Sequence, residues 1–588
     1  MGLLDDDNEY VEAIKEASFE AHCRYLRSLF ATLLLTNTLS RPEFVWEKTW
    51  HLLGDDILFK RRKETHIPDL IIPEHHLKNL ILVEIENYLI SNGSTLSKFS
   101  TMPYPDDDSL RQGTNRLINE ELSHDPHELK SEFTILKESL TEEQLNVFNQ
   151  IVNAVECQSG GLFFVYGYGG TGKTFLWKTL AAAIRCKEDS MCFIKPNDDV
   201  ANLLKESKLI IWDEAPMVHK HAFEALDRTM KDILSSSTNN SSELPFGGKV
   251  IVFGGDFRQI LPVIPNGTRQ QIVNSSLSSS YLWSECKVLK LTKNMRLRTG
   301  AESSNSDSIK KFAKWLLDIG EGNIGSENDG EAFIELPDDL VITDSDDPIQ
   351  SLIDFVHPSI LHQYKNPGFF SERAILAPKN EVVHEINDRL LSLFPGEEKE
   401  YLSCDSICQT EQVLDSFQQG LYSPDNLNAL KISGLPNHRL VLKVGVPVML
   451  LRNIDQQNGL CNGTRLQVTF LGKRVIEAEV ISGGNIGTRV FIPRISMVPS
   501  DKKIPFQFQR RQFPLTVCFA MTINKSQGQS LSRVGLYLKD PVFTHGQLYV
   551  ALSRVKSRQG VKILSFDCDG KPTSKTSNVV YKEIFHNL

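Results

Sequence analysis

One glycine-rich segment constrains the fold of this chain more than any other feature. Residues 167–174 fit the pattern G-x-x-x-x-G-K-[ST]; they follow a short apolar run, 162–165, and precede apolar positions at helical spacing, 175–184. In the strand, loop and helix that this order predicts, glycines let backbone N–H groups close around phosphate oxygens. The helix N-terminus adds partial positive charge there. The segment therefore predicts a phosphate-binding loop.

The residues of this loop have distinct predicted roles. The Lys173 ammonium reaches the β- and γ-phosphates of a nucleotide, and the Thr174 hydroxyl ligates Mg²⁺. An accidental glycine-rich turn is the alternative, and the flanking strand and helix argue against it. The residues predicted to bind the nucleotide here are Gly167, Tyr168, Gly169, Gly170, Thr171, Gly172, Lys173 and Thr174.

Length and composition predict a soluble globular protein of several domains inside the cell. The chain of 588 residues would fill roughly three to five domains. Hydrophobic residues make up 40 % of it, no apolar run is long enough to span a membrane, and its acidic start lacks the features of a signal peptide. The ten cysteines include no C-x-x-C pair, which favours free thiols in a reducing compartment. The net charge of −10 argues against a basic coating protein but allows a local positive groove.

A second apolar strand is predicted over residues 208–214, and it ends in two carboxylates, Asp213 and Glu214. Because the carboxyl ends of parallel strands share one edge of a sheet, both side chains are expected beside the phosphate loop. Asp213 is predicted to hold Mg²⁺ through water, and Glu214 to polarise the attacking water. A strand that merely ends in two acidic residues is the alternative.

Two further predicted strands also run into polar residues. Residues 249–253 precede a loop that carries Gln259, an amide predicted to sense the γ-phosphate or to position the water. Residues 287–296 repeat the pattern and place Arg296 after the strand. Each segment could be a simple edge loop, but their arrival after consecutive strands favours a shared site.

A helix is predicted to begin just upstream of the phosphate loop. Thr141 is a good N-cap, and Glu143 and Gln144 lie in the first turn. Gln144 has two interpretations: its amide contacts the edge of an adenine, or the helix that carries it only packs against the sheet.

Residues 1–135 are predicted to form a helical extension without a catalytic constellation. Helical periodicity runs over residues 10–35 and 76–90. The basic run 60–63 either touches nucleic acid or forms a solvated helix face.

The second half of the chain repeats the strand-then-helix pattern. Residues 373–378 predict a strand and 380–393 a helix, and a later predicted helix over 544–555 presents Arg554. A guanidinium that reaches a nucleotide from a second domain stabilises charge in the transition state. The alternative for Arg554 is a surface salt bridge.

The predicted fold class is α/β, with two RecA-like P-loop NTPase domains built on parallel sheets, a small inserted β-rich domain and the helical extension. The predicted domains are the helical N-terminal extension at 1–135, a first RecA-like ATPase domain at 136–298, shortened between 186 and 207, a linker or helical insertion at 299–371, a second RecA-like domain at 372–570 with the β-rich insertion at about 395–515, and a tail at 571–588.

Together these motifs resemble those of a superfamily-one helicase. More narrowly, they resemble the petite-integration-frequency (PIF) family of ATP-dependent DNA helicases, in its plant Helitron-transposon branch. The resemblance extends over residues 140–569. The segments that carry it are YGYGGTGKT (166–174), IWDEAPM (211–217), FGG (246–248), FRQILPV (257–263) and YVALSRV (549–555).

The resemblance implies a Mg²⁺- and ATP-dependent helicase that moves 5′-to-3′ on single-stranded DNA and unwinds duplex DNA. It implies roles in DNA repair, recombination and telomere maintenance. A monomer is expected, in the nucleus or alternatively the mitochondrion, without a membrane partner. The residue roles implied by the resemblance are adenine recognition by Gln144, nucleotide and Mg²⁺ binding by Lys173, Thr174 and Asp213, general base catalysis by Glu214, γ-phosphate response by Gln259, Arg296 and Arg554, and strand contact by Asn524, Lys525 and Ser526.

Two departures from the family pattern shape the alternatives. Only 22 residues, 186–207, separate the loop helix from the Asp213 strand, where family members place a further strand and helix that grip DNA. We expect a missing strand there, or a rearranged one built from residues 191–194. The nuclease domain expected upstream in an intact transposon protein is absent, so residues 1–135 are predicted to be the remnant of the segment that followed it. The alternative functions are a nucleotide-gated DNA-binding ATPase that does not unwind, and a decayed transposon-derived helicase.

Overall fold

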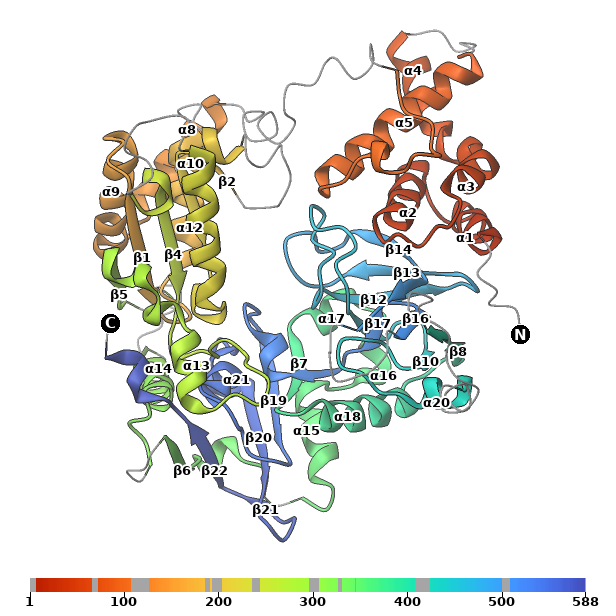
Figure 1. Ribbon diagram of the computed structural model, residues 1–588. Coiled ribbons are helices and arrows are strands. Elements are labelled where there is room, and N and C mark those ends of the chain that lie inside the picture. Colours follow the sequence, from red (N-terminus) through yellow and green to blue (C-terminus); the bar gives the residue numbers. More distant parts are fainter. Residues whose placement is uncertain are drawn as a thin grey trace. The chain divides into compact units, whose positions relative to one another are not determined.

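The glycine-rich loop lies at the carboxyl edge of a parallel sheet, as its sequence predicts. Five strands form this sheet in the order β2-β3-β4-β1-β5, and every pairing in it is parallel (Figure 1). The strands are β1 (Gly161–Gly167), β2 (Met191–Cys192), β3 (Leu209–Trp212), β4 (Val250–Gly255) and β5 (Cys286–Leu291). Because they run parallel, the segments that follow β1, β3, β4 and β5 emerge at one edge of the sheet.

In this computed structural model the chain divides into two compact units. Unit 1 comprises Met1–Gln112, His357–Ala374 and Val383–Met521, and unit 2 comprises Gly113–Val356, Ile375–Val382 and Thr522–Leu588. The structure describes residues 7–65, 72–106, 126–185, 191–192, 203–234, 244–293, 295, 306–325, 330–343, 345–407, 423–499, 508–586 and 588.

Alternating side chains give the first sheet two apolar faces. On one face Phe163 is buried in a cluster with side chains from α9 and α10. On the other face Phe164 contacts Phe257 with ring centroids 5.2 Å apart, and Phe253 contacts Phe223 of α12 at 5.0 Å. Burial on both faces explains why these strands are almost continuously apolar. The helices of this part are α8 (Pro126–Glu138), α9 (Glu142–Glu156), α10 (Lys173–Arg185) and α12 (Lys220–Leu234).

A second five-stranded sheet has the order β18-β7-β19-β20-β21. Its strands β19 and β20 pair in parallel, and β21 closes the edge in the antiparallel direction. Its strands are β7 (Arg373–Ala377), β18 (Ala520–Thr522), β19 (Arg533–Leu538), β20 (Val561–Phe566) and β21 (Pro572–Thr573). Unit 2 also contains α14 (Ser306–Glu321), α15 (Pro348–Val356), α21 (Gln547–Ser553) and a two-stranded sheet of β6 (Glu331–Glu335) and β22 (Lys575–Val579).

Unit 1 joins the N-terminal helices to a β-rich region in one core. Val475 and Phe491 of that region belong to the same buried cluster as Phe30 and Trp46 of the helices. Polar contacts flank this core: the Glu16 carboxylate accepts hydrogen bonds from the backbone N–H groups of Lys473 and Arg474, at 2.7 and 2.8 Å. The N-terminal helices are α1 (Asn8–Ser18), α2 (Cys23–Leu35), α3 (Pro42–Thr49), α4 (Asp55–Thr65) and α5 (Glu74–Ser91).

The β-rich region contains three antiparallel sheets, with strand orders β14-β13-β12-β11-β17, β15-β16-β9 and β10-β8. Its strands are β8 (Lys399–Leu402), β9 (Cys404–Ile407), β10 (Arg439–Leu442), β11 (Pro447–Leu450), β12 (Arg465–Leu471), β13 (Val475–Val480), β14 (Arg489–Pro493), β15 (Ile495–Met497), β16 (Phe508–Gln512) and β17 (Leu515–Val517). Four helices complete unit 1: α16 (Ile360–Gln363), α17 (Pro367–Ser371), α18 (Asn380–Leu393) and α20 (Pro424–Ala429).

The α/β fold class is confirmed, and single elements refine the prediction. The predicted helix 380–393 is α18 with the same bounds. The stretch 10–35 forms two helices because His22 is extended, and the helix predicted over 544–555 begins only at Gln547 because Gly546 adopts a φ of 75°. The rearranged strand expected at 191–194 is present as the short β2; residues 193–194 lie outside the described residues.

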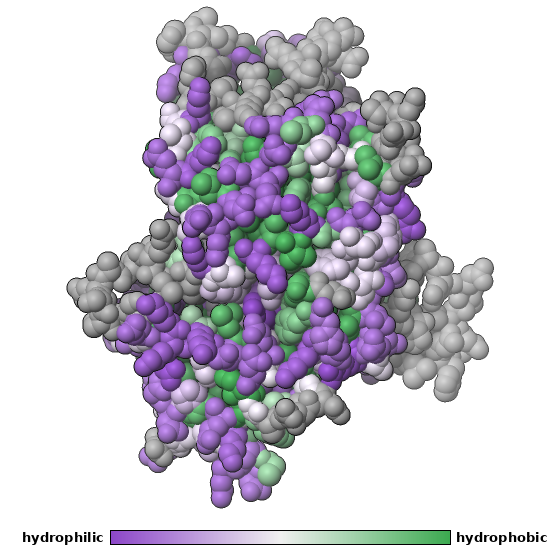
Figure 2. Space-filling view, turned by 90° about the vertical axis from the view of Figure 1, so that its left-hand side faces the viewer, coloured by the Kyte–Doolittle hydropathy of each residue, from purple (hydrophilic) through white to green (hydrophobic). Residues whose placement is uncertain are grey.

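The structure also allows a search for membrane-spanning helices and metal-binding clusters. Among the residues that it describes, no helix is long and apolar enough to cross a membrane, and no cluster of His, Cys, Asp and Glu could hold a metal ion. On the face shown in Figure 2, hydrophobic side chains are scattered among hydrophilic ones. The described cysteines are free thiols, while Cys408 lies outside the described part.

Candidate nucleotide site

The glycine-rich loop is held in shape by its own side chains. The Thr171 hydroxyl donates to the Tyr168 carbonyl at 2.9 Å, and the Tyr168 hydroxyl donates to the Thr292 carbonyl after β5 at 2.6 Å. Lys173, which is buried, donates its ammonium to the Gly167 carbonyl across the loop. Thr174 is exposed on the first turn of α10. The Lys173 ammonium and the N-terminus of α10 therefore provide positive charge at the rim of the loop.

Glycine is required at two positions of this loop. Gly170 and Gly172 have φ values of 102° and 80°, which other residues rarely adopt. A Cβ at Gly172 would lie 2.5 Å from the Gln144 Nε2 and 3.2 Å from the Met295 Cγ. The loop is therefore packed too closely at Gly172 to admit any larger residue.

The helix upstream of the loop begins where the sequence predicts, but its glutamine is already hydrogen-bonded. Thr141 and Gln144 form a reciprocal capping box at the start of α9. The Gln144 Oε1 accepts from the Thr141 N–H at 3.0 Å, and the Nε2 donates to the Thr171 carbonyl at 3.0 Å. With 1 % of its surface exposed, Gln144 ties the helix to the loop. Its contact with adenine stays a prediction, because that contact requires this amide to exchange partners.

The two carboxylates after β3 differ in their surroundings. Asp213 is exposed and its Oδ1 accepts the Glu214 N–H at 3.0 Å. Glu214 adopts a left-handed backbone with φ 54°, and its Oε2 is buried without a hydrogen-bond partner among the described residues. Burial raises the pKa of the Glu214 carboxyl; the negative charges of Asp213 and Asp256 add to this, whereas Lys173 and Arg554 oppose it. Glu214 thus has the unpaired oxygen and the raised pKa that suit a proton acceptor.

The loop after β4 contains Gln259 and contacts segments from the C-terminal part of the chain. Gln259 is 3 % exposed, and its Oε1 accepts from the Gln527 amide at 3.3 Å. His545 also contacts the loop after β4: its Nε2 lies 2.7 Å from the Phe257 carbonyl oxygen. Its Nδ1 accepts a hydrogen bond from the Tyr581 N–H at 2.8 Å. Because Nδ1 accepts, the proton is on Nε2, which donates to Phe257; burial lowers the pKa of this imidazole to about 4, so it stays neutral.

Arg554 lies directly after α21 and is buried. Its Nε donates to the Val550 carbonyl at 3.0 Å and its Nη1 to the Gln529 carbonyl at 3.3 Å, so the guanidinium is folded against its own helix. The charges of Arg554 and Lys173 both lower the pKa of the Glu214 carboxyl. A residue that follows α21 and a residue of the glycine-rich loop therefore act electrostatically on one carboxylate within unit 2.

The residues predicted to contact a DNA strand lie on a single 3₁₀ turn, Ile523–Ser526. The Asn524 Oδ1 accepts from the Gln547 amide at 3.1 Å, and Lys525 is partly exposed. Ser526 is fully buried, and its hydroxyl donates to the Ile523 carbonyl at 2.7 Å. Asn524 and Lys525 are therefore accessible on this turn, whereas the Ser526 side chain stabilises the turn itself. Arg296 lies outside the described residues.

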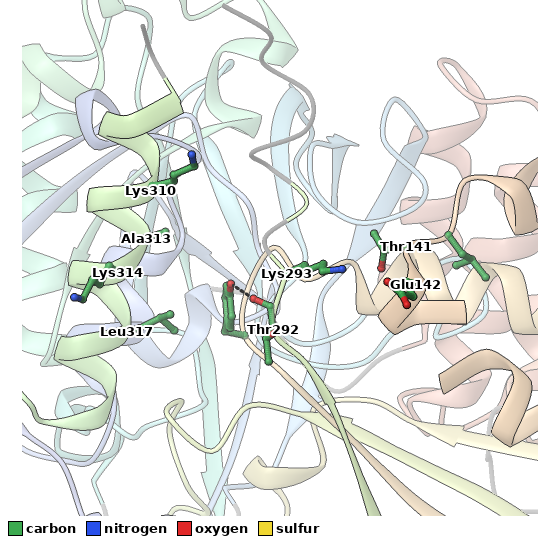
Figure 3. A pocket seen from close by; sticks show the side chains of 10 residues that line it. Thr141, Glu142, Thr292, Lys293, Lys310, Ala313, Lys314 and Leu317 are labelled. Carbon is green, nitrogen blue, oxygen red and sulfur yellow. Dashed lines mark hydrogen bonds between the residues drawn. The ribbon is translucent and has the colours of Figure 1, made fainter. Parts of the chain in front are cut away.

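An open pocket of about 680 Å³ lies beside the loop (Figure 3). One wall is α14, from which Lys310, Ala313, Lys314 and Leu317 project, and the opposite wall is the start of α9 with Thr141 and Glu142. Tyr168, Thr292 and Lys293 form its floor. A volume of this size admits a nucleoside, and its lysines favour an anionic ligand.

Sequence reasoning assigned Glu143 only to a first helical turn, and its actual contact was missed. Its carboxylate accepts from the Thr292 hydroxyl at 2.6 Å and from the backbone N–H groups of Thr292 and Lys293 at 2.9 and 3.1 Å. Burial alone would raise the pKa of Glu143, but these hydrogen bonds outweigh it and the pKa is lowered. Its partners lie about 150 residues away in sequence, so no local pattern could have indicated the contact.

A parallel sheet with a G-x-x-x-x-G-K-T loop after its first strand and carboxylates after a neighbouring strand defines a RecA-like P-loop protein. Family models agree with this class. The model described as "PIF1-like helicase" matches residues 139–191 and 183–330, and "DNA helicase Pif1, 2B domain" matches residues 425–471. These matches show that part of the chain is similar to PIF1-like helicases.

Individual relatives are distant from this chain. "ATP-dependent DNA helicase PIF1" of Danio rerio is 25 % identical over 484 residues, covering 76 % of this chain and 64 % of the relative. "ATP-dependent DNA helicase Pif1" of Bdellovibrio bacteriovorus is 27 % identical over 367 residues, covering 62 % of this chain and 67 % of the relative. The chain thus spans about two thirds of the length of these relatives. The solved structure of Bacteroides Pif1 bound to single-stranded DNA has a TM-score of 0.48 at 22 % identity, covering 72 % of this chain and 92 % of that one.

Proposed function

We propose that this protein is a Mg²⁺- and ATP-dependent DNA helicase that couples hydrolysis to movement along single-stranded DNA and to duplex unwinding. The relatives named above are ATP-dependent DNA helicases, and one solved relative binds single-stranded DNA. The observation that carries the proposal is that the buried Lys173 of the glycine-rich loop and the Glu214 Oε2, which is buried without a hydrogen-bond partner among the described residues, follow neighbouring parts of one parallel sheet. The charges of Lys173 and Arg554 both lower the pKa of the Glu214 carboxyl. A triphosphate placed there would be held from two sides, so its cleavage would change the contact between them.

In this proposal each site residue has one task. Lys173 binds the β- and γ-phosphates, Glu214 accepts the proton of the attacking water, and Arg554 stabilises charge as the bond to the γ-phosphoryl group breaks. Gln259 and Arg296 respond to the γ-phosphate. The open pocket beside Tyr168 holds the nucleoside, where Gln144 reaches adenine once its amide releases the loop. Asn524 and Lys525 contact the strand, and Ser526 keeps their turn in shape.

The residues expected to hold Mg²⁺ fit that ion. Thr174 and Asp213 are both exposed and supply oxygen ligands, which Mg²⁺ prefers. A Cβ at Gly254 would lie 2.7 Å from the Asp213 Oδ1, so the glycine keeps the space that this carboxylate occupies. When bound, the ion would neutralise charge on the phosphate oxygens.

The finer features of the proposal rest on the sequence motifs. They are 5′-to-3′ polarity, membership of the plant Helitron branch, action as a monomer in the nucleus or mitochondrion, and roles in DNA repair, recombination and telomere maintenance. We also propose the domain boundaries given above, with two adjustments to their description: the segment 299–371 carries α14 and α15, and the segment 571–588 carries β22, which pairs with β6.

The test is ATP turnover of the full chain with and without single-stranded DNA, together with strand separation on duplexes that carry a 5′ or a 3′ tail. We expect DNA to stimulate turnover and only the 5′-tailed duplex to be separated. Glu214→Gln should bind ATP but turn over at least about a hundredfold more slowly, because the proton acceptor is lost. Absence of turnover in the wild-type chain, or full turnover in Glu214→Gln, would refute the proposal.

The short connection between α10 and β3 favours one alternative, a nucleotide-gated DNA-binding ATPase that does not unwind. Within that connection the structure describes only the two-residue strand β2 and residues 203–208. If the lost segment is what transmits force to DNA, the protein would bind a strand in an ATP-dependent way and hydrolyse ATP. In that case the same assay would show stimulated turnover with no separation of either duplex.

A further inference from the structure

A buried carboxylate, that of Asp256, directly follows β4 in unit 2. Asp256 has no exposed surface, and a buried charge is costly unless hydrogen bonds compensate for it. The Oδ1 accepts from the Arg258 N–H at 3.1 Å and from the Arg258 Nη1 at 3.3 Å. The Oδ2 accepts from the Tyr549 hydroxyl at 2.7 Å. The second oxygen of Asp256 is thus satisfied by a side chain from another element, α21.

That element also carries Arg554. Tyr549 and Val550 are neighbours on α21, and the Val550 carbonyl is the group to which the Arg554 Nε donates. The rotation of this short helix therefore sets both the Tyr549 hydroxyl and the Arg554 guanidinium. Because the helix has fewer than two turns, side-chain anchors decide its orientation more than its own hydrogen bonds do.

A close approach of two backbone segments also joins α21 to the loop after β4. Gly546, directly before α21, packs on the backbone that joins Arg258 to Gln259: a Cβ at Gly546 would touch the Arg258 carbonyl oxygen and lie 2.7 Å from the Gln259 carbonyl carbon. The hydrogen bond from His545 to the Phe257 carbonyl lies beside it. The start of α21 is thus packed directly against the loop after β4, and that loop contains Gln259.

Arg258 connects the loop after β4 to the glycine-rich loop and to α14. Its guanidinium lies 5.2 Å from the ring centre of Tyr166 and 6.0 Å from that of Tyr168, and its Nη2 donates to the Glu321 carboxylate at 2.6 Å. At Gly320 of α14, a Cβ would lie 2.8 Å from the Tyr549 Cδ2 and 2.9 Å from the Arg258 Cδ. The tyrosine ring, the guanidinium and α14 therefore meet without room for one methyl group.

We propose that Tyr549 is a positioning residue for hydrolysis: its hydrogen bond to Asp256 fixes α21 against the loop after β4 and so sets where Arg554 meets the γ-phosphate. The inference rests on the proposed ATP hydrolysis and names a residue that does not touch the nucleotide. Tyr549 acts through Arg554, so its contribution exists only while Arg554 is present.

The test compares Tyr549→Phe with Tyr281→Phe in the full chain. Tyr281 is the control, because its hydroxyl also donates at 2.7 Å to a buried aspartate of the same unit, Asp227, although Tyr281 itself is 54 % exposed. Both variants remove one oxygen from a tyrosine that is bonded to an aspartate. We expect Tyr549→Phe to lower kcat for DNA-stimulated ATP turnover about tenfold with KM within twofold, and Tyr281→Phe to leave both unchanged. Binding of a fluorescent ATP analogue should be equal in all three proteins.

A double-mutant cycle separates positioning from a general structural role. In an Arg554→Ala background, Tyr549→Phe should lower kcat by less than twofold, because the group that it positions is gone. Gly320→Ala, which crowds the same contact without removing a polar group, should reproduce the kcat loss of Tyr549→Phe. Equal tenfold losses with and without Arg554, or wild-type kcat in Tyr549→Phe, would overturn the inference. Either result leaves the proposed function intact as long as the wild-type chain hydrolyses ATP and Glu214→Gln does not.

Discussion

Two sites, one in each unit, bury charged side chains in opposite ways. In unit 1, Asp405 and Arg510 have no exposed side-chain surface and are joined by a bidentate ion pair with an Nη2–Oδ2 distance of 2.7 Å. The remaining Arg510 donors reach the Leu427, Leu430 and Pro436 carbonyls. In unit 2, Glu214 has a buried oxygen with no hydrogen-bond partner among the described residues, and nearby Lys173 donates only to a carbonyl of its own loop in the contacts found there.

This difference distinguishes a buried ion pair that stabilises the fold from buried groups that are available for catalysis. A fully paired buried charge holds its neighbours in place, and removing one partner leaves the other uncompensated. A buried charge without a partner is tolerated where a ligand is to complete it, and such groups gather at functional sites. We therefore expect substitutions in the Asp405 pair to change the free energy of unfolding and substitutions at the glycine-rich loop to change turnover.

The largest effect is expected from Asp405→Ala. It leaves the Arg510 guanidinium buried without its carboxylate, which should lower the free energy of unfolding by about 3–5 kcal/mol. Denaturant unfolding of unit 1, followed by the fluorescence of Trp46 and Trp50, measures it. The nucleotide affinity of the molecules that stay folded should equal that of the wild type. A loss below about 1 kcal/mol would show that the pair is not what stabilises this region.

Lys173→Ala is the converse experiment and should rank next. It removes a buried ammonium that, among the residues that the structure describes, donates to a backbone carbonyl of the loop and to no carboxylate, so ATP turnover should fall by at least about a hundredfold, which corresponds to about 3 kcal/mol. The midpoint of thermal unfolding should stay near that of the wild type. Lys178→Ala, on the same helix but with 62 % of its side chain exposed, is the matched control and should keep full turnover. Wild-type turnover in Lys173→Ala would contradict the site assignment.

Glu9→Gln tests the contact between the N-terminal helices and the β-rich region. The Glu9 carboxylate lies 2.8 Å from the Arg511 Nη2 and 3.8 Å from the Arg494 Nε, with all three side chains buried. Loss of the negative charge should cost about 1–3 kcal/mol of unfolding free energy in unit 1. Glu12→Gln, whose pair with Lys15 is exposed on the same helix, should cost almost nothing. Equal effects of the two variants would mean that the buried contact does not dock the helices.

The sequence predicts a feature well when the residues that determine the feature lie close together in the chain. The glycine-rich loop, the capping residue Thr141 and the helix α18 follow from periodicity and from residues a few positions apart. The bond from Tyr549 to Asp256 could not be predicted, because it joins residues 293 positions apart. The contact between Glu16 and the turn at Lys473 joins residues 457 positions apart. The sequence likewise predicts residues 1–135 only as a helical extension, whereas Phe30 and Trp46 of that extension share a core with Val475 and Phe491 of the β-rich region.

The smallest expected effect is a shift in the pH dependence of turnover. Burial raises the pKa of Glu214, and turnover needs its ionised form, so kcat should fall as the pH drops through that raised pKa. Arg554 lowers this pKa and Asp256 raises it. The acid limb of the kcat profile should therefore move to higher pH in Arg554→Gln and to lower pH in Asp256→Asn. Shifts in the reverse directions would show that another group limits the acid limb.

The most direct test of the central claim is the ATP turnover of Arg554→Ala, measured with saturating single-stranded DNA and compared with its affinity for a fluorescent ATP analogue. If Lys173 and Arg554 act on one triphosphate, the variant should bind the analogue within about threefold of the wild type and lose at least about a hundredfold in kcat. Turnover equal to that of the wild type would contradict the account, because Arg554 would then have no part in hydrolysis.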